Sequence, residues 1–154
     1  MRCAVITVSD THTPENDTSG QYIQQALTQA GHTVSAYTIV KDEPADIRRQ
    51  LTHCIQAEGT DAILLSGGTG LSPRDGAYEV VHGCLEKELT GFGELFRYLS
   101  YAEIGSAAMM SWATADVARG TVIVSMPGSS AAVRLAMDKL ILPELGHISH
   151  VARG

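Results

Sequence analysis

The chain has 154 residues, of which 44% are hydrophobic and 18% charged, a composition that indicates a folded globular domain and excludes a disordered chain. At this length we expect one domain, spanning residues 1–154. The formal net charge of −6 and the aromatic content of 5% argue against a nucleic-acid binder, which needs a basic face and stacking rings.

The N-terminal half alternates between apolar runs and helical stripes. Residues 3–8 and 61–65 are apolar runs that predict buried strands, and residues 33–40 alternate loosely between apolar and polar side chains and predict a further strand. Between them, a stripe that follows Asp17 and stops at Gly31 predicts one helix, and a stripe that follows Pro44 predicts another. This rhythm indicates parallel strands with crossover helices, so the predicted fold is α/β: a three-layer α/β/α sandwich with a mostly parallel central sheet.

The C-terminal half is less regular. Residues 75–85 and the stripe at 92–99 predict helices, and residues 113–118 and 121–125 predict strands on either side of a turn. A last helix is expected from about Ser129.

The sequence also bears on the cellular compartment. The apolar run at residues 3–8 is too short for a signal-peptide core, and no apolar stretch approaches the ~20 residues that span a bilayer. The cysteines Cys3, Cys54 and Cys84 form an odd set without a CxxC pair, which indicates reduced, buried thiols. We therefore expect a cytoplasmic protein without membrane partners.

Four loops follow the predicted parallel strands: Ser9-Asp10, residues 41–43, residues 66–70 and residues 126–130. Because parallel strands end at one edge of the sheet, these loops can converge there, at the place where open α/β sheets bind ligands.

The loop Ser66-Gly67-Gly68-Thr69-Gly70 is the strongest single signal. Its glycines allow the backbone to approach a ligand and to point successive N–H groups at an anion. It matches neither a Walker A motif nor the dinucleotide fingerprint, and a tight strand-to-helix turn is the alternative interpretation. Pro127-Gly128-Ser129 is a second candidate anion-binding site, and the alternative interpretation is an ordinary helix cap.

Several charged residues accompany these loops. Asp42 and Asp75 follow two of the strands, while Asp10 and Asp17 flank the first loop, and each taken alone is also explained as a cap or a solvated charge. Carboxylates beside a phosphate seat would repel the anion, so we expect Mg²⁺ between Asp42 and Asp75. Arg74 offers a bidentate phosphate contact, or alternatively a salt bridge to a surface acid.

The same residues carry a family resemblance that covers nearly the whole chain in order. The matching segments are Ile6-Thr7-Val8-Ser9-Asp10, Asp17-Thr18-Ser19-Gly20, the run from Ser66 through Arg74 to Asp75, Gly91-Phe92-Gly93-Glu94-Leu95-Phe96-Arg97, and Met126-Pro127-Gly128-Ser129. Together they resemble the MoaB/MogA family of molybdenum-cofactor biosynthesis proteins, and the stretch at residues 96–105 resembles the MoaB branch more closely.

The resemblance implies a molybdopterin-binding domain whose active members transfer AMP from Mg-ATP to the terminal phosphate of molybdopterin. It places catalytic aspartates at Asp42 and Asp75 and a phosphate seat at Gly67–Gly70. Other pocket positions match Ser9, Asp10, Ser19 and the turn at 127–129, whereas Glu94 lies in a family motif without an assigned role. It further implies a homo-oligomer, trimeric or hexameric, and a molybdenum-inserting enzyme as a partner.

Two other functions stay open at this point. A non-catalytic molybdopterin-binding or scaffold protein would share the glycine loop without needing both aspartates. A general phosphate-binding α/β protein would share only the loop. His12 lies in the first of the four loops and is a candidate for testing, without an assigned role. The Met- and Tyr-bearing stretch at residues 98–112 is interpreted either as a subunit interface or as core.

Overall fold

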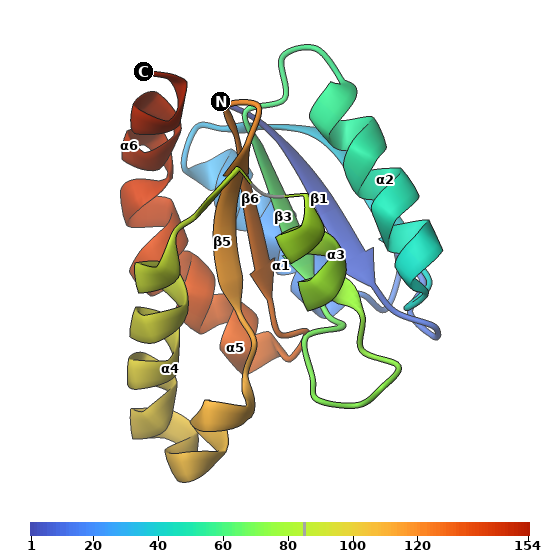
Figure 1. The fold of residues 1–154 in the computed structure, drawn as a ribbon, viewed down its shortest axis with the longest axis vertical. Helices are drawn as coiled ribbons and strands as arrows, with labels where there is room; N and C mark the ends of the chain where they lie inside the picture. The colour runs from blue at the N-terminus through green and yellow to red at the C-terminus, as the bar shows by residue number, and fades with distance from the viewer. Residues whose placement is uncertain (85) are drawn as a thin grey trace.

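The centre of the molecule is a six-stranded sheet in the order β2-β1-β3-β6-β5-β4 (Figure 1). The structure is a computed structural model that describes residues 1–84 and 86–154. Strands β2, β1, β3 and β6 run parallel, and β5 and β4 close the sheet as antiparallel strands. The strands are β1 Arg2–Val8, β2 Thr33–Val40, β3 Ala62–Ser66, β4 Lys87–Glu88, β5 Thr114–Ala118 and β6 Thr121–Met126.

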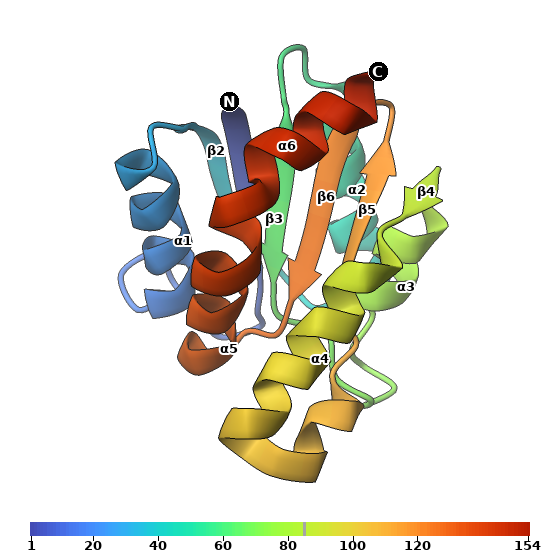
Figure 2. The same cartoon turned by 90° about the vertical axis from the view of Figure 1, so that its left-hand side faces the viewer.

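Helices cover both faces of this sheet (Figure 2). On one face lie α1 Thr18–Gln29, α4 Thr90–Ile104, α5 Ser130–Leu135 and α6 Leu142–Arg153; on the other lie α2 Pro44–Gln56 and α3 Ala77–Gly83. Alternate side chains of each strand enter opposite cores: Val5 packs among α1 and its neighbours, while Ile6 packs with α2 and α3. The predicted three-layer sandwich with a mostly parallel sheet is confirmed.

The topology defines one switch point. The chain leaves β1 toward β2, on one side of β1, and leaves β3 toward β6, on the other side, so the connections to the next strands run in opposite directions. Helix α4 and the 3₁₀ helix Gly105–Met110 that follows it extend beyond the carboxyl ends of the parallel strands (Figure 2). The fold therefore forms a crevice at the carboxyl ends of the strands, which is where parallel α/β sheets bind ligands.

Some elements differ from the prediction. The helix expected at 75–85 is α3, Ala77–Gly83, and its expected last residue, Leu85, lies outside the described residues. The last helix is interrupted by a π-helical segment, Ala136–Ile141, just before Pro143, whose missing N–H prevents a regular α-helical bond there. Within the described residues, no helix is both long and apolar enough to cross a membrane.

Candidate functional site

The glycine loop after β3 is packed tightly against its neighbours. Gly67 and Gly68 have positive φ angles of 98° and 69°, which strongly favour glycine. A Cβ atom on Gly67 would lie 2.3 Å from the carbonyl oxygen of Val8, and one on Gly128 would lie 3.2 Å from the Cα atom of Gly67. The Gly67 N–H also donates to the carbonyl of Met126 at 3.0 Å. The loops after β1, β3 and β6 therefore converge, as the sequence predicted.

The two predicted catalytic carboxylates lie along this loop. A Cβ atom on Gly68 would be 3.3 Å from Oδ1 of Asp42, and one on Gly70 would be 2.6 Å from Oδ2 of Asp75. Oδ2 of Asp75 also accepts the N–H of Ser72 at 3.1 Å, which holds the carboxylate at the loop. Loops after two different strands thus bring both aspartates to one glycine segment.

Asp42 is the more perturbed of the two groups. Its Oδ1 is buried and has no hydrogen-bond partner among the described residues. Burial raises the pKa of Asp42, the charges of Asp75 and Asp10 raise it further, and the N–H of Gly76 acts in the opposite direction. An oxygen that is desolvated and unpartnered has free capacity for a cation or a donor.

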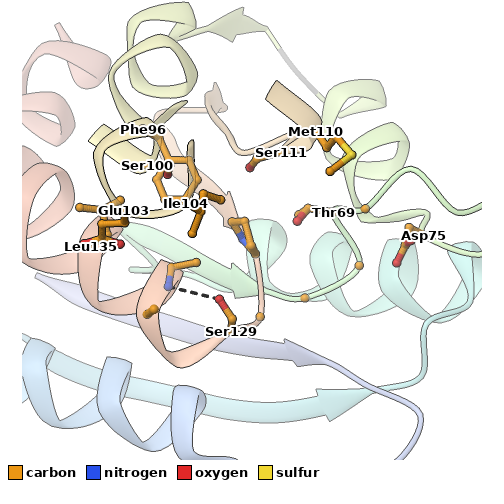
Figure 3. A pocket seen from close by; sticks show the side chains of 17 residues that line it. Thr69, Asp75, Phe96, Ser100, Glu103, Ile104, Met110, Ser111, Ser129 and Leu135 are labelled. Atoms are coloured by element: carbon orange, nitrogen blue, oxygen red, sulfur yellow. Dashed lines mark hydrogen bonds between the residues drawn. The ribbon is translucent and has the colours of Figure 1, made fainter. Parts of the chain in front are cut away.

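A cavity of about 460 Å³ opens beside the glycine loop (Figure 3). Residues 67–70, Asp75 and the turn 127–129 form one side, and α4, the 3₁₀ helix and α5 form the other. Asp42 is not among the described residues that line it; Asp42 precedes α2, and its Oδ1 adjoins Gly68, which does line the cavity. The glycine loop consequently borders both the cavity and the carboxylate of Asp42.

Arg74 takes part in an ion-pair cluster on the outer side of the loop. Its Nε and Nη2 donate to Oδ2 of Asp10 at 2.9 and 2.8 Å, and its Nη1 donates to Glu43 at 3.1 Å. The hydrogen bond from Arg74 lowers the pKa of Asp10, whose other oxygen accepts the N–H of Asp42 at 3.1 Å. Of the two alternatives for Arg74, the salt bridge is what the structure contains, and a phosphate contact stays a prediction.

Other predicted positions organise the loops. Oγ of Ser9 accepts the N–H groups of Thr11 and His12 at 3.2 and 3.0 Å, which shapes the loop after β1 and leaves His12 exposed. Oγ of Ser19 donates to the carbonyl of Gly128 at 2.8 Å and ties α1 to the turn after β6. Both serines therefore act on the site through the backbone.

Asp17 is not brought into the cavity. It is 1% exposed, caps α1 by accepting the N–H of Gly20 at 3.0 Å, and accepts the hydroxyl protons of Thr7 (2.6 Å) and Tyr37. Its predicted role as a cap is confirmed. Burial and the bond to Asp17 raise the pKa of Tyr37 above its ordinary value.

Three further predicted residues are divided between two cavities and the core. Ser129 lines the cavity and caps α5 by accepting the N–H of Ala132 at 3.3 Å. Ser66 is buried, and its Oγ has no hydrogen-bond partner among the described residues. Glu94 lies in a separate cavity with Trp112, away from the glycine loop.

Sequence reasoning missed the wall that faces the glycine loop. Phe96, Ser100 and Glu103 of α4 line the cavity, with Ile104 and, from α5, Leu135 on the same side. Their spacing is i, i+4, i+7, which is one face of a helix. The available signal was a serine and a glutamate on an otherwise apolar helical stripe.

The metal prediction can be tested against the ligand chemistry. Among residues 1–84 and 86–154, no group of three or more His, Cys, Asp or Glu side chains is placed to hold a metal ion. Mg²⁺ in nucleotide sites uses one or two carboxylates and completes its coordination with phosphates and water. The unpartnered Oδ1 of Asp42 and the carboxylate of Asp75 fit that requirement and do not form a preassembled metal cage.

The fold and the site define an α/β protein with a glycine loop after β3, a cavity of ligand size beside it and two flanking aspartates. Residues 4–147 match the family model described as "Probable molybdopterin binding domain". The chain is 54% identical over 149 residues to molybdenum cofactor biosynthesis protein B of Bacillus subtilis, covering 96% of this chain and 88% of the relative.

Solved structures agree with this match. A crystal structure of molybdenum cofactor biosynthesis protein B superposes with a TM-score of 0.95 at 50% identity, covering 99% of this chain and 95% of the other. The tungsten cofactor synthesizing protein MoaB from Pyrococcus furiosus superposes with a TM-score of 0.91 at 37% identity, covering 99% and 97%. The chain belongs to the MoaB/MogA family of molybdenum-cofactor biosynthesis proteins, so the resemblance seen in the sequence is confirmed.

Proposed function

We propose that this protein binds molybdopterin and transfers AMP from Mg-ATP to its terminal phosphate, as a molybdopterin adenylyltransferase in molybdenum-cofactor biosynthesis. A terminal phosphate oxygen of molybdopterin forms a bond to the α-phosphorus of ATP, the bond from that phosphorus to the bridging oxygen breaks, and pyrophosphate leaves. The observation that carries the proposal is the placement of Asp42 and Asp75 along a glycine loop that walls a cavity.

The residues present suit a reaction between two anions. A phosphate oxygen is already deprotonated at neutral pH, so the attacking group needs no general base, and positioning and charge neutralisation dominate the barrier. The N–H groups of residues 68–70 can donate hydrogen bonds to phosphate oxygens on the cavity side, which Ser129 also lines. Asp42 and Asp75 would hold Mg²⁺, which supplies charge neutralisation between the two substrates when bound.

The loop that borders both Asp42 and the cavity also suggests how two substrates are arranged. Molybdopterin would occupy the cavity, and the nucleotide would lie on the outer side with Asp42, Asp10 and Arg74. Their phosphates would then meet at Gly68 and Asp75. Arg74 is paired with Asp10 and Glu43, so we expect it to orient the outer side of the loop. When the nucleotide binds, we expect Arg74 to release one of these carboxylates and to bind a phosphate in its place.

The decisive assay incubates the purified protein with molybdopterin, ATP and Mg²⁺ and measures pyrophosphate. We expect release by the wild type, and a loss of at least about 100-fold in Asp42→Asn and Asp75→Asn, since each removes a charge from the reacting centre. Asp46→Asn is the matched control, because Asp46 contacts only the exposed Arg49 on α2 at 3.1 Å. Unchanged turnover in both aspartate variants would refute these roles.

A non-catalytic molybdopterin-binding or scaffold protein is the alternative. Such a protein binds molybdopterin, protects it in the cavity and releases no pyrophosphate under the same conditions. Retention of both aspartates on the glycine loop favours the enzyme, because binding alone does not need an unpartnered buried carboxylate oxygen. Family membership also favours a pterin over other phosphate-bearing ligands.

The exposed apolar surface supports a homo-oligomer, trimeric or hexameric. Of the ten large hydrophobic side chains exposed within the described residues, seven lie between residues 95 and 112, on α4 and the segment after it. Tyr98 and Met109 are 76% and 75% exposed. A second copy of the chain would cover this surface, which a monomer would leave in water.

Two wider assignments accompany the proposed activity. We place the protein in the cytoplasm, where reduced thiols and ATP are available, and cell fractionation tests this. The adenylylated product would pass to a molybdenum-inserting enzyme, an exchange that co-purification in the presence of the product would detect.

A further inference from the structure

The cavity beside the glycine loop has two chemically different ends (Figure 3). At one end lies the glycine loop, where residues 68–70 offer backbone N–H groups while that of Gly67 is bound to Met126, and Thr69 and Ser129 add hydroxyl groups. At the other end, α4 presents Phe96, Ser100 and Glu103. A ligand that fits both ends carries an anionic group at the first end and hydrogen-bond donors on an otherwise flat, apolar body at the second.

Glu103 is the only carboxylate at the second end among the described residues that line the cavity. Phe96 and Ser100 precede it on the same helical face and are 1% and 5% exposed, whereas Glu103 itself is exposed, at the solvent-facing end of that stripe where the cavity opens. Within the described part of the chain, the ion pairs involve other acids, and none engages the carboxylate of Glu103. The carboxylate is therefore available to a ligand and acts only as an acceptor when ionised.

The helix itself does not explain an acid at this place. Glu103 lies in the last turn of α4, where no basic residue balances it. Backbone carbonyl groups point out of a helix at its C-terminal end, so a negative side chain there is electrostatically unfavourable. The carboxylate of Glu103 and the last carbonyl groups of α4 together favour a ligand that carries several N–H donors.

We propose that Glu103 is a specificity-determining residue that accepts the 2-amino and N3–H protons of the pterin ring. This inference rests on the proposed function, and it assigns the pterin to the α4 end and the phosphate to the glycine-loop end. A pterin presents two adjacent donors to a carboxylate, which matches its two oxygens. Adenine presents one amino group beside an acceptor nitrogen, so Glu103 also excludes the nucleotide from this end.

The test uses 6-(hydroxymethyl)pterin and 6-(hydroxymethyl)lumazine, which differ at position 2, where lumazine has a carbonyl instead of the amino group. Fluorescence titration measures the affinity of each for the full-length wild type, Glu103→Gln and the control Glu58→Gln, whose side chain is exposed in the turn after α2. We expect the wild type and the control to prefer the pterin by about tenfold, the range of one charged hydrogen bond. Glu103→Gln should lose that preference while its affinity for Mg-ATP stays within twofold.

The outcomes separate this inference from the proposed function. If Glu103→Gln keeps the pterin preference, or if the wild type has none, the assignment of Glu103 is overturned. If the preference depends on Glu103 but no pyrophosphate is released from molybdopterin and ATP, Glu103 keeps its role and the adenylyl transfer fails. If the wild type binds neither compound, the assignment of Glu103 is overturned, and pyrophosphate release from molybdopterin and ATP decides the adenylyl transfer independently.

Discussion

Gly67→Ala tests whether the loop after β3 is held against β1. The substitution adds a Cβ atom 2.3 Å from the backbone carbonyl oxygen of Val8, at a residue whose φ angle is 98°. The backbone conformation costs an alanine about 1–2 kcal/mol. Relief of the contact with a backbone atom costs about 1–3 kcal/mol more, as for other overpacked sites.

Gly31→Ala is the matched control. Gly31 has a φ angle of 88° but would meet nothing within 4 Å, so this variant carries the conformational cost without the steric one. Both substitutions reduce the entropy of the unfolded chain by the same amount, and this contribution cancels in the comparison. We therefore expect free energies of unfolding reduced by about 1 kcal/mol for Gly31→Ala and about 3 kcal/mol for Gly67→Ala.

Urea denaturation followed by circular dichroism measures both values. A shift of the loop would also move Gly67 away from Gly128, so pterin affinity should fall in Gly67→Ala and not in Gly31→Ala. Equal losses of stability in the two variants, within about 0.5 kcal/mol, would mean that the loop is free to move. The convergence of the three loops would then not be the basis of the site.

Three further predictions follow from single contacts. Gly70→Ala places its Cβ atom 2.6 Å from Oδ2 of Asp75. Because this side-chain atom can move away, we expect stability to stay nearly unchanged while pyrophosphate release falls at least tenfold. Full activity of the variant would argue against a defined position of Asp75. Burial raises the pKa of Asp116 to about 6, so the folded state binds the proton of Asp116 more tightly than the unfolded chain does. Ionisation of Asp116 therefore destabilises the protein, and this destabilisation is complete above pH 6. Asp116→Asn should be more stable than the wild type by about 2–3 kcal/mol at pH 8, a difference that vanishes near pH 4 in urea titrations; a difference independent of pH would exclude this ionisation as its cause. Tyr98→Glu and Met109→Glu should convert an oligomer to monomers in sedimentation velocity at micromolar concentration, and a wild type that sediments as a monomer would remove the interface.

Local patterns were sufficient for the elements whose cause is local. The apolar runs predicted β1 and β3, because strands buried on both faces need continuous hydrophobic side chains. The cap at Asp17 was predictable because its carboxylate satisfies N–H groups of the adjacent helix. The two-residue edge strand β4 was not, since Lys87 and Glu88 show no pattern and extend only because they pair with β5.

The features of the candidate site can likewise be separated into those that the sequence predicts and those that depend on the tertiary structure. The sequence by itself determined the glycine loop, the aspartates that follow parallel strands, and the family, because these depend on residue type and on the common direction of the strands. Only the tertiary structure decided that Arg74 pairs with Asp10, that Asp17 is buried against Tyr37, and that Glu103 faces the glycine loop across a cavity. Each of these depends on which distant segment packs nearby, and such contacts are selected by the packing of the whole chain and not by the residues next to them.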